Sequence, residues 1–310
     1  MHNHVPQPIF IAGPTAVGKS AVALALAEKI GGEIISVDSM QVYRGLDIGT
    51  AKPSRAEQQR VPHHLIDVVD LVEPFDAAKF VFLAQKAVAE IQSRGRSPVF
   101  CGGTGLYFKA FLDGLGEAPP TDATLRAELE AAPLAALLHE IEQRDPLTFA
   151  KIDKNNPRRV VRAVEVIRLT GKPFSAQRSD WETHGAKPET RNFIGLSRSA
   201  ADLHARVNVR VDEMFRAGLV DETRDLLRRG LEQNRTAMQA IGYRQVVEHL
   251  RGERSLPETI ELVKIKTRQF AKRQMTWFRK QLRVDWVAVQ EDESTAAIAQ
   301  NIYNSVLVRC

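Results

Sequence analysis

The chain has 310 residues, enough for one large α/β domain with an insertion or for two domains. Its 44% hydrophobic and 26% charged residues are ordinary for a globular protein, and no run approaches the roughly 18 consecutive apolar residues of a membrane span. The first residues lack the pattern of a secretory signal, and two cysteines are too few for a disulfide framework or a cysteine-rich zinc site. We therefore expect a cytoplasmic protein with no membrane partner.

Basic residues exceed acidic ones, which gives a net charge of +5. The excess is uneven, because residues 264–283 contain eight Lys or Arg residues and no acid. Composition alone favours a solvated helix face for such a run, but a polyanionic partner is the alternative.

The first 115 residues alternate between strand and helix patterns. Strands are predicted at 8–12, 33–37, 64–69 and 97–101, and helices at 19–30 and 77–94. This alternation predicts an α/β fold whose parallel sheet is covered on both faces.

The pattern then changes to helices only. Residues 121–170 show only helical periodicity, whereas 192–196 predicts another strand, followed by helices over most of 203–283 and a last strand at 285–289. We expect a catalytic core made of residues 1–115 and 191–310, interrupted by a helical insertion domain at 116–190.

A phosphate-binding loop lies between the first strand and the first helix. Its residues are Gly13, Pro14, Thr15, Ala16, Val17, Gly18, Lys19 and Ser20. Glycines allow successive backbone N–H groups to point at one anion, and the helix that follows adds its positive end. Lys19 supplies a point charge to the phosphates and Ser20 a ligand for Mg²⁺. The core is therefore predicted to resemble a P-loop NTPase.

The strand at 97–101 ends in Gly102-Gly103-Thr104-Gly105, without the magnesium-holding Asp of a typical ATPase. The carboxylate that ends an early strand is Asp38. Because ligands bind at the carboxyl ends of parallel strands, Asp38, Thr104 and the loop should face one crevice. From geometry, Asp38 is open to three roles: a partner of magnesium-bound water, a general base, or a helix N-cap.

Several motifs together resemble the tRNA dimethylallyltransferases, in their bacterial form. The motifs are residues 13–20 (GPTAVGKS), 38–43 (DSMQVY), 102–107 (GGTGLY), 156–159 (NPRR), 240–244 (AIGYR) and 267–274 (TRQFAKRQ). They span nearly the whole chain in the order of the family. The resemblance implies transfer of a dimethylallyl group from dimethylallyl diphosphate to N6 of adenosine 37 in tRNA, with release of diphosphate.

The resemblance also implies roles for the residues at the predicted crevice. Asp38 matches the family's general base, and Thr104 matches the threonine that contacts the departing oxygen. Residues 13–20 would hold the diphosphate, with Mg²⁺ at Ser20. Arg206 and Arg210 are both candidates for the diphosphate-binding arginine, and we prefer Arg210 as the catalytic one.

A wider set of residues is implied to bind the tRNA anticodon stem-loop. The insertion domain would clamp the stem, and the flipped adenosine would reach Asp38 through a channel. The expected contacts are Asp38, Ser39, Met40, Gln41, Arg126, Arg158, Arg159, Arg162, Gln239, Ala240, Ile241, Gly242, Tyr243, Arg244, Thr267, Arg268, Lys272 and Arg273. We expect the enzyme to act as a monomer.

Three other functions fit parts of the pattern. A transferase acting on free adenine nucleotides would need neither the insertion nor the basic helices. A small-molecule kinase would need the missing Asp. A non-catalytic RNA-binding module would not explain why Lys19, Ser20, Asp38 and Thr104 are all present.

Overall fold

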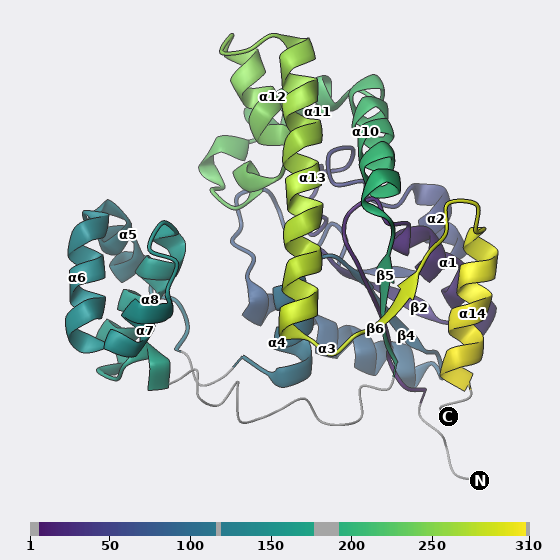
Figure 1. Cartoon of the computed structure of the whole chain (residues 1–310), viewed down its shortest axis with the longest axis horizontal. Coiled ribbons are helices and arrows are strands. Elements are labelled where there is room, and N and C mark those ends of the chain that lie inside the picture. Colours follow the sequence, from purple (N-terminus) through teal and green to yellow (C-terminus); the bar gives the residue numbers. More distant parts are fainter. Residues whose placement is uncertain (1–5, 116–118, 177–191, 308–310) are drawn as a thin grey trace. The chain divides into compact units, whose positions relative to one another are not determined.

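The computed structural model describes residues 6–115, 119–176 and 192–307 (Figure 1). The chain divides into two compact units. The larger unit is formed by residues 1–112 and 188–310, and the smaller one by the intervening residues 113–187.

A six-stranded sheet forms the centre of the larger unit. Its strands are β1 (Ile9–Ala12), β2 (Glu33–Val37), β3 (His63–His64), β4 (Pro98–Gly102), β5 (Phe193–Ser197) and β6 (Asp285–Ala288). They lie in the order β3-β2-β4-β1-β5-β6, and all pairs are parallel. This sheet confirms the predicted α/β fold.

Side chains of the central strands alternate between two hydrophobic cores. In β1, Phe10 joins the core that contains the aromatic residues of α3 and α4, whereas Ile11 joins the core beneath α1 and α14. Both faces of the sheet are therefore covered, which explains why the strands read as continuous apolar runs.

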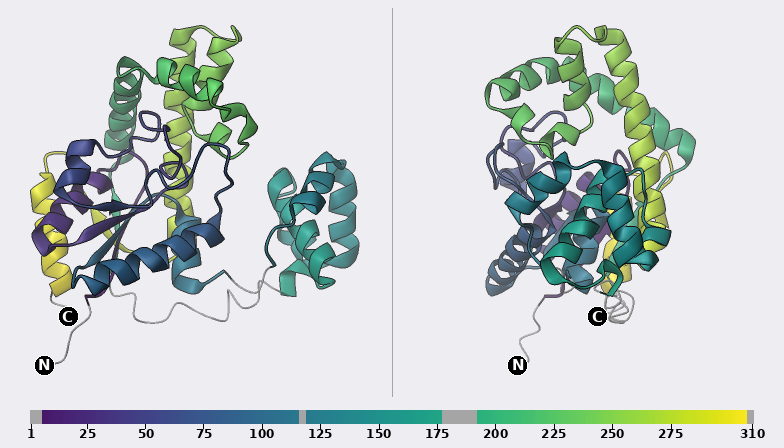
Figure 2. Two further views of the ribbon diagram at one scale, coloured as in Figure 1. Left: turned by 180° about the vertical axis from the view of Figure 1, so that it is seen from behind. Right: turned by 90° about the vertical axis from the view of Figure 1, so that its left-hand side faces the viewer.

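Helices of the larger unit surround this sheet. They are α1 (Lys19–Ile30), α2 (Arg55–Arg60), α3 (Ala77–Ser93), α4 (Gly105–Asp113), α10 (Ala200–Arg216), α11 (Leu219–Arg228), α12 (Tyr243–Leu250), α13 (Leu256–Gln281) and α14 (Thr295–Leu307), with short 3₁₀ turns at Leu231–Gln233 and Ala237–Gln239. Helices α10 to α13 gather at the end of the sheet from which β5 leads into α10 (Figures 1 and 2). Among the described residues, no helix has both the length and the apolar character to cross a membrane.

The strand predicted at 64–69 is wrong in its extent. Regular pairing stops at His64, because Leu65 and Asp67 have positive φ angles of 62° and 54° that break an extended chain. Only Val69 returns to the ladder, through an isolated parallel bridge to Tyr43.

The smaller unit consists of helices within its described residues. They are α5 (Ala123–Ala131), α6 (Leu134–Arg144), α7 (Pro146–Lys151) and α8 (Pro157–Thr170). Helix α8 buries Val160, Val164 and Ile167 against α5 and α6, so the unit has a hydrophobic core of its own.

Candidate active site

The phosphate loop connects β1 to α1, and its backbone has the geometry needed to bind an anion. Ala16 and Gly18 have positive φ angles of 65° and 105°, a conformation in which neighbouring N–H groups turn toward one side. Lys19 and Ser20 form the first turn of α1. The Lys19 Nζ donates to the Pro14 carbonyl at 3.2 Å, so the ammonium group folds back over the loop.

Positive charge accumulates around this loop. Burial lowers the pKa of Lys19, and the positive charge of Arg210 acts in the same direction. Burial also lowers the pKa of Arg210, and Arg206 adds to that effect. These cations are disfavoured by burial and by one another, so a multivalent anion bound among them would be strongly stabilised.

Two arginines brace the loop from β5 and α10. The Arg206 Nε donates to the Ala16 carbonyl and the Arg198 Nε to the Val17 carbonyl, both at 2.9 Å. Arg198 is also paired with Asp202 at 2.7 Å. Sequence reasoning missed Arg198, although its position directly after β5, at the carboxyl end of a strand, is the signal that could have found it.

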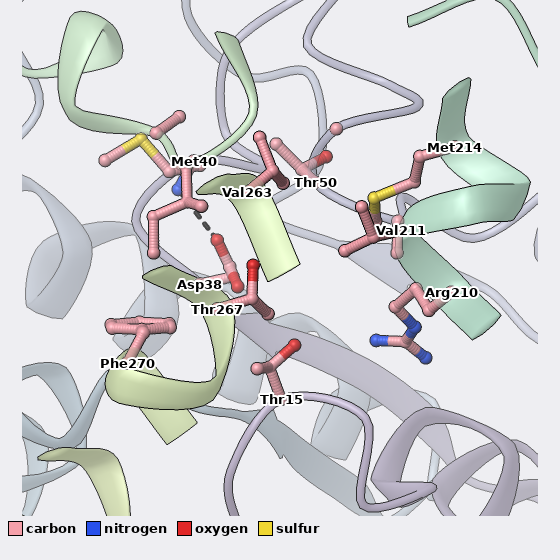
Figure 3. Close-up of a pocket in the computed structure, with 14 residues that line it drawn as sticks. Thr15, Asp38, Met40, Thr50, Arg210, Val211, Met214, Val263, Thr267 and Phe270 are labelled. Carbon is pink, nitrogen blue, oxygen red and sulfur yellow. Dashed lines mark hydrogen bonds between the residues drawn. The ribbon is translucent and has the colours of Figure 1, made fainter. Parts of the chain in front are cut away.

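Asp38 follows β2 and organises a tight turn. Its Oδ1 accepts hydrogen bonds from the backbone N–H of Met40 at 2.8 Å (Figure 3) and from that of Gln41 at 3.2 Å. No helix begins at this turn, so the N-cap role is excluded. Oδ2 has no hydrogen-bond partner in the described part of the chain, which leaves this oxygen available to a ligand in the pocket that Asp38 lines.

Thr104 lies at the end of β4, next to the turn of Asp38. Its N–H donates to the Val37 carbonyl, and its Oγ1 accepts from the Ser39 N–H, both at 3.2 Å. The structure therefore brings the loops after β2 and β4 together, as the strand-end rule predicts. Thr104 does not itself line the pocket described next.

A pocket opens between the phosphate loop and helices α10 and α13 (Figure 3). Thr15, Asp38, Arg210 and Thr267 form its polar side. Apolar side chains form the rest of the wall: Met40, Val211, Met214, Ala240, Ile241, Val263 and Phe270. This division suits a ligand with an anionic head and a short hydrocarbon tail. The pocket also distinguishes the two candidates for the diphosphate-binding arginine, because Arg210 lines the pocket and Arg206 does not.

Residues 49–51 complete the wall of the pocket, and buried or half-buried side chains hold them in place. The Glu222 carboxylate accepts from the N–H of Ile48 at 2.9 Å and from the Tyr243 hydroxyl at 2.6 Å. The Gly49 N–H donates to the same hydroxyl at 3.0 Å. The Gln41 amide donates to the Thr50 carbonyl at 3.1 Å.

Two of the residues predicted to contact tRNA have hydrogen-bond partners inside the protein. Tyr243 is completely buried and hydrogen-bonded to Glu222, so its side chain supports the pocket wall. Gln41 also accepts a hydrogen bond from the Ser36 hydroxyl at 2.8 Å, so both ends of its amide have partners inside the protein.

The neighbouring predicted contacts differ in accessibility. Ala240 and Ile241 line the pocket, whereas Gly242 is buried. Gln239 and Arg244 are exposed, and Arg244 is paired with Glu248 at 3.2 Å.

The basic run on α13 is divided between internal contacts and solvent. Lys264 is paired with Asp212 and Glu261, both at 2.9 Å, and Arg268 donates to Asn208 at 2.5 Å. Lys272 and Arg273 are exposed.

The four arginines expected to bind the anticodon stem lie in the smaller unit. Arg126 and Arg162 both pair with the buried carboxylate of Glu165, at 2.6 and 2.7 Å. Both arginines thus neutralise this buried charge. The sequence did not predict these ion pairs. Arg158 and Arg159 are exposed in the first turn of α8.

A magnesium ion fits the donor chemistry at the start of α1. Ser20 is exposed there and offers a hydroxyl oxygen next to the predicted phosphate position. Mg²⁺ is commonly held by one or two protein oxygens together with phosphate oxygens and water. The described residues contain no group of three or more His, Cys, Asp or Glu that could hold a metal by themselves.

A phosphate loop and a carboxylate at one partly apolar pocket are features expected of an α/β enzyme whose substrate joins a diphosphate to a hydrocarbon group. The model of the IPP transferase family matches residues 41–281. The chain belongs to this family of bacterial tRNA dimethylallyltransferases.

Three comparisons illustrate this relationship. A tRNA dimethylallyltransferase of Trichlorobacter lovleyi is 45% identical over 94% of this chain and 96% of its own length. The crystal structure of a tRNA isopentenylpyrophosphate transferase from Bacillus halodurans is 39% identical, with a TM-score of 0.70 over 98% of both chains. A eukaryotic dimethylallyltransferase captured acting on tRNA is 27% identical, with a TM-score of 0.80 over 98% of this chain and 80% of its own.

Proposed function

We propose that this enzyme transfers the dimethylallyl group of dimethylallyl diphosphate to N6 of adenosine 37 in tRNA and releases diphosphate. The observation that carries the proposal is the pocket, whose polar side adjoins the phosphate loop and whose apolar side matches a five-carbon tail. Membership of the tRNA dimethylallyltransferase family supplies the class of acceptor.

In the proposed reaction, adenosine N6 attacks the first carbon of the dimethylallyl group while the bond from that carbon to the diphosphate oxygen breaks. The proton lost from N6 passes to Asp38, which acts as general base through Oδ2, the oxygen not occupied by the turn. An exocyclic amine is a weak nucleophile, so removing its proton as the new bond forms lowers the barrier.

The leaving diphosphate gains negative charge as its bond to carbon breaks. We propose that backbone N–H groups of the phosphate loop at residues 16–20, together with Lys19 and Arg210, stabilise that charge, with Arg206 bracing the loop. We assign Thr104 to the departing oxygen. Mg²⁺ at Ser20, when bound, would neutralise further phosphate charge.

The tRNA would approach from the exposed side of α13 and from the smaller unit. Lys272 and Arg273, together with Arg158 and Arg159, are the cations proposed to bind its backbone, because all four are exposed. Met40, Thr267 and Ile241 would border the flipped adenosine. A monomer acting in the cytoplasm remains our prediction.

The test is to incubate the protein with Mg²⁺, dimethylallyl diphosphate labelled in the hydrocarbon, and unmodified tRNA or AMP. We expect label in the tRNA, in a nucleoside that digestion identifies as N6-dimethylallyl adenosine, and none in a tRNA with guanosine at position 37. Label in AMP alone would instead indicate a transferase of free nucleotides. Phosphate release from ATP with a small acceptor would indicate a kinase.

A further inference from the structure

Gln274 lies on the inner side of α13, facing the sheet and not the solvent. It is only 8% exposed, although its neighbours Lys272 and Arg273 are exposed. Its position therefore differs from that of the basic residues on the same helix, and its contacts point to a different role.

The side-chain amide of Gln274 connects two loops of the site. Its Oε1 accepts a hydrogen bond from the backbone N–H of Thr15, in the phosphate loop, at 2.9 Å. Its Nε2 donates to the backbone carbonyl of Gly103, directly before Thr104, at 2.9 Å. One planar group thus binds both the loop that would hold the diphosphate and the loop that carries Thr104.

The fit around this amide is tight. A Cβ atom added at Gly103 would lie 2.3 Å from the Gln274 Nε2, and one added at Gly105 would lie 2.0 Å from the Trp277 ring. Real Cβ contacts are essentially never this short, so the glycines allow α13 to rest directly on the loop after β4.

We propose that Gln274 is a positioning residue that fixes the phosphate loop relative to Thr104. The inference rests on the proposed function, in which the leaving oxygen must meet Thr104 while its phosphate stays in the loop. Only an amide side chain of this length offers an acceptor to Thr15 and a donor to Gly103 at once. Leucine offers neither, and an ionised glutamate offers only the acceptor.

The first experiment measures kcat and KM for both substrates in Gln274→Leu and Gln274→Glu. Misplacing catalytic groups by about 1 Å costs roughly 100-fold in rate, so we expect kcat to fall by roughly 10- to 100-fold in both variants. The tRNA dissociation constant should change less than about twofold. Gln281→Leu is the matched control, because it makes the same change at an exposed position of the same helix.

Thermal unfolding of each variant separates positioning from folding. A kcat within about twofold of the parent enzyme in a folded variant would overturn the proposal. A loss of kcat that is proportional to the unfolded fraction of the variant, and that disappears at low temperature, would also overturn the proposal. Should Gln274→Leu fail to fold, Gln274→Glu carries the same test, since it keeps the bond to Thr15.

A double-mutant cycle with Thr104→Ala tests whether Gln274 acts through Thr104. We expect Gln274→Leu to cost much less in the Thr104→Ala background than in the parent enzyme. Equal costs in both backgrounds, or full activity of Thr104→Ala, would overturn the assignment. A parent enzyme that transfers no label to tRNA would instead reject the proposed function, so the two failures are distinguishable.

Discussion

Asp38 holds the turn after β2 and is also the residue that we propose as general base. Its Oδ1 holds the turn through the N–H groups of Met40 and Gln41, and its Oδ2 remains available to the pocket. An asparagine can keep the first role, because its carbonyl oxygen still accepts both hydrogen bonds. It cannot take a proton from adenosine.

We therefore predict that Asp38→Asn lowers kcat by roughly 10²- to 10⁴-fold and leaves the tRNA dissociation constant within about twofold. Single-turnover transfer of labelled dimethylallyl groups and filter binding would measure the two quantities. Asp225→Asn, an exposed change on α11, serves as the control. Near-normal turnover in Asp38→Asn would remove the general-base assignment.

Helix α13 shows the division of labour at the scale of an element. Its inner side lines the pocket with Val263, Thr267 and Phe270 and, one turn further along the same face, binds the two loops through Gln274. The outer side presents Lys272 and Arg273 to solvent. A single helix of 26 residues thus contacts the region proposed for each substrate.

Replacing both Lys272 and Arg273 by Ala should weaken tRNA binding and reduce its salt dependence. Each lost phosphate contact should lower the slope of log K against log salt by roughly one, because fewer counterions are released on binding. Titrations at several salt concentrations would measure this slope.

The control for this change is the double variant Arg224→Ala, Arg228→Ala on α11. It removes the same charge, but both arginines are exposed and paired with Asp221 and Asp225. An equal loss of affinity in the control would mean that net charge, and not α13, determines tRNA binding.

At the scale of the whole molecule, one buried carboxylate stabilises the amino-terminal end of β2, which is the end of the sheet opposite the site. Glu33, at the start of β2, is 2% exposed and receives hydrogen bonds from Arg94 and His64, both at 2.7 Å. Arg96 adds a third contact at 3.1 Å. Burial by itself would raise the pKa of Glu33, but the hydrogen bonds from Arg94 and His64 outweigh it and lower the pKa from 4.5 to about 2.

The depressed pKa predicts how stability depends on pH. The folded state binds the Glu33 proton more weakly than the unfolded chain, so this stabilisation is present above about pH 4.5 and is lost as the pH falls toward 2. Its size is on the order of 3 kcal/mol.

Denaturant unfolding of Glu33→Gln and the parent enzyme between pH 7 and pH 3 would measure the contribution of Glu33 to the free energy of unfolding. The difference in free energy of unfolding should be largest near neutral pH and shrink on acidification. A difference that is independent of pH would show that packing, and not the charge of Glu33, stabilises this end of the sheet.

Local patterns were sufficient to predict much of the molecule. Apolar runs predicted β1 and β2, and the glycine-containing motif between β1 and α1 predicted the phosphate loop. Each of these features is determined by residues that are close in the sequence. The strand-end rule brought Asp38 and Thr104 to one edge of the sheet. The strand at 64–69 failed because the positive φ angles of Leu65 and Asp67 are imposed by the surrounding structure.

The amino-acid sequence by itself determined the α/β class, the phosphate loop and, through its motifs, the family. Only the tertiary structure decided which polar side chains have their hydrogen-bond or ion-pair partners inside the protein. Tyr243 supports the pocket wall, and Arg126 neutralises Glu165. Gln274 connects Thr15 and Gly103, which are 88 residues apart in the sequence. The physical reason is that burial and hydrogen-bond partners depend on segments distant in the chain, which local periodicity does not encode.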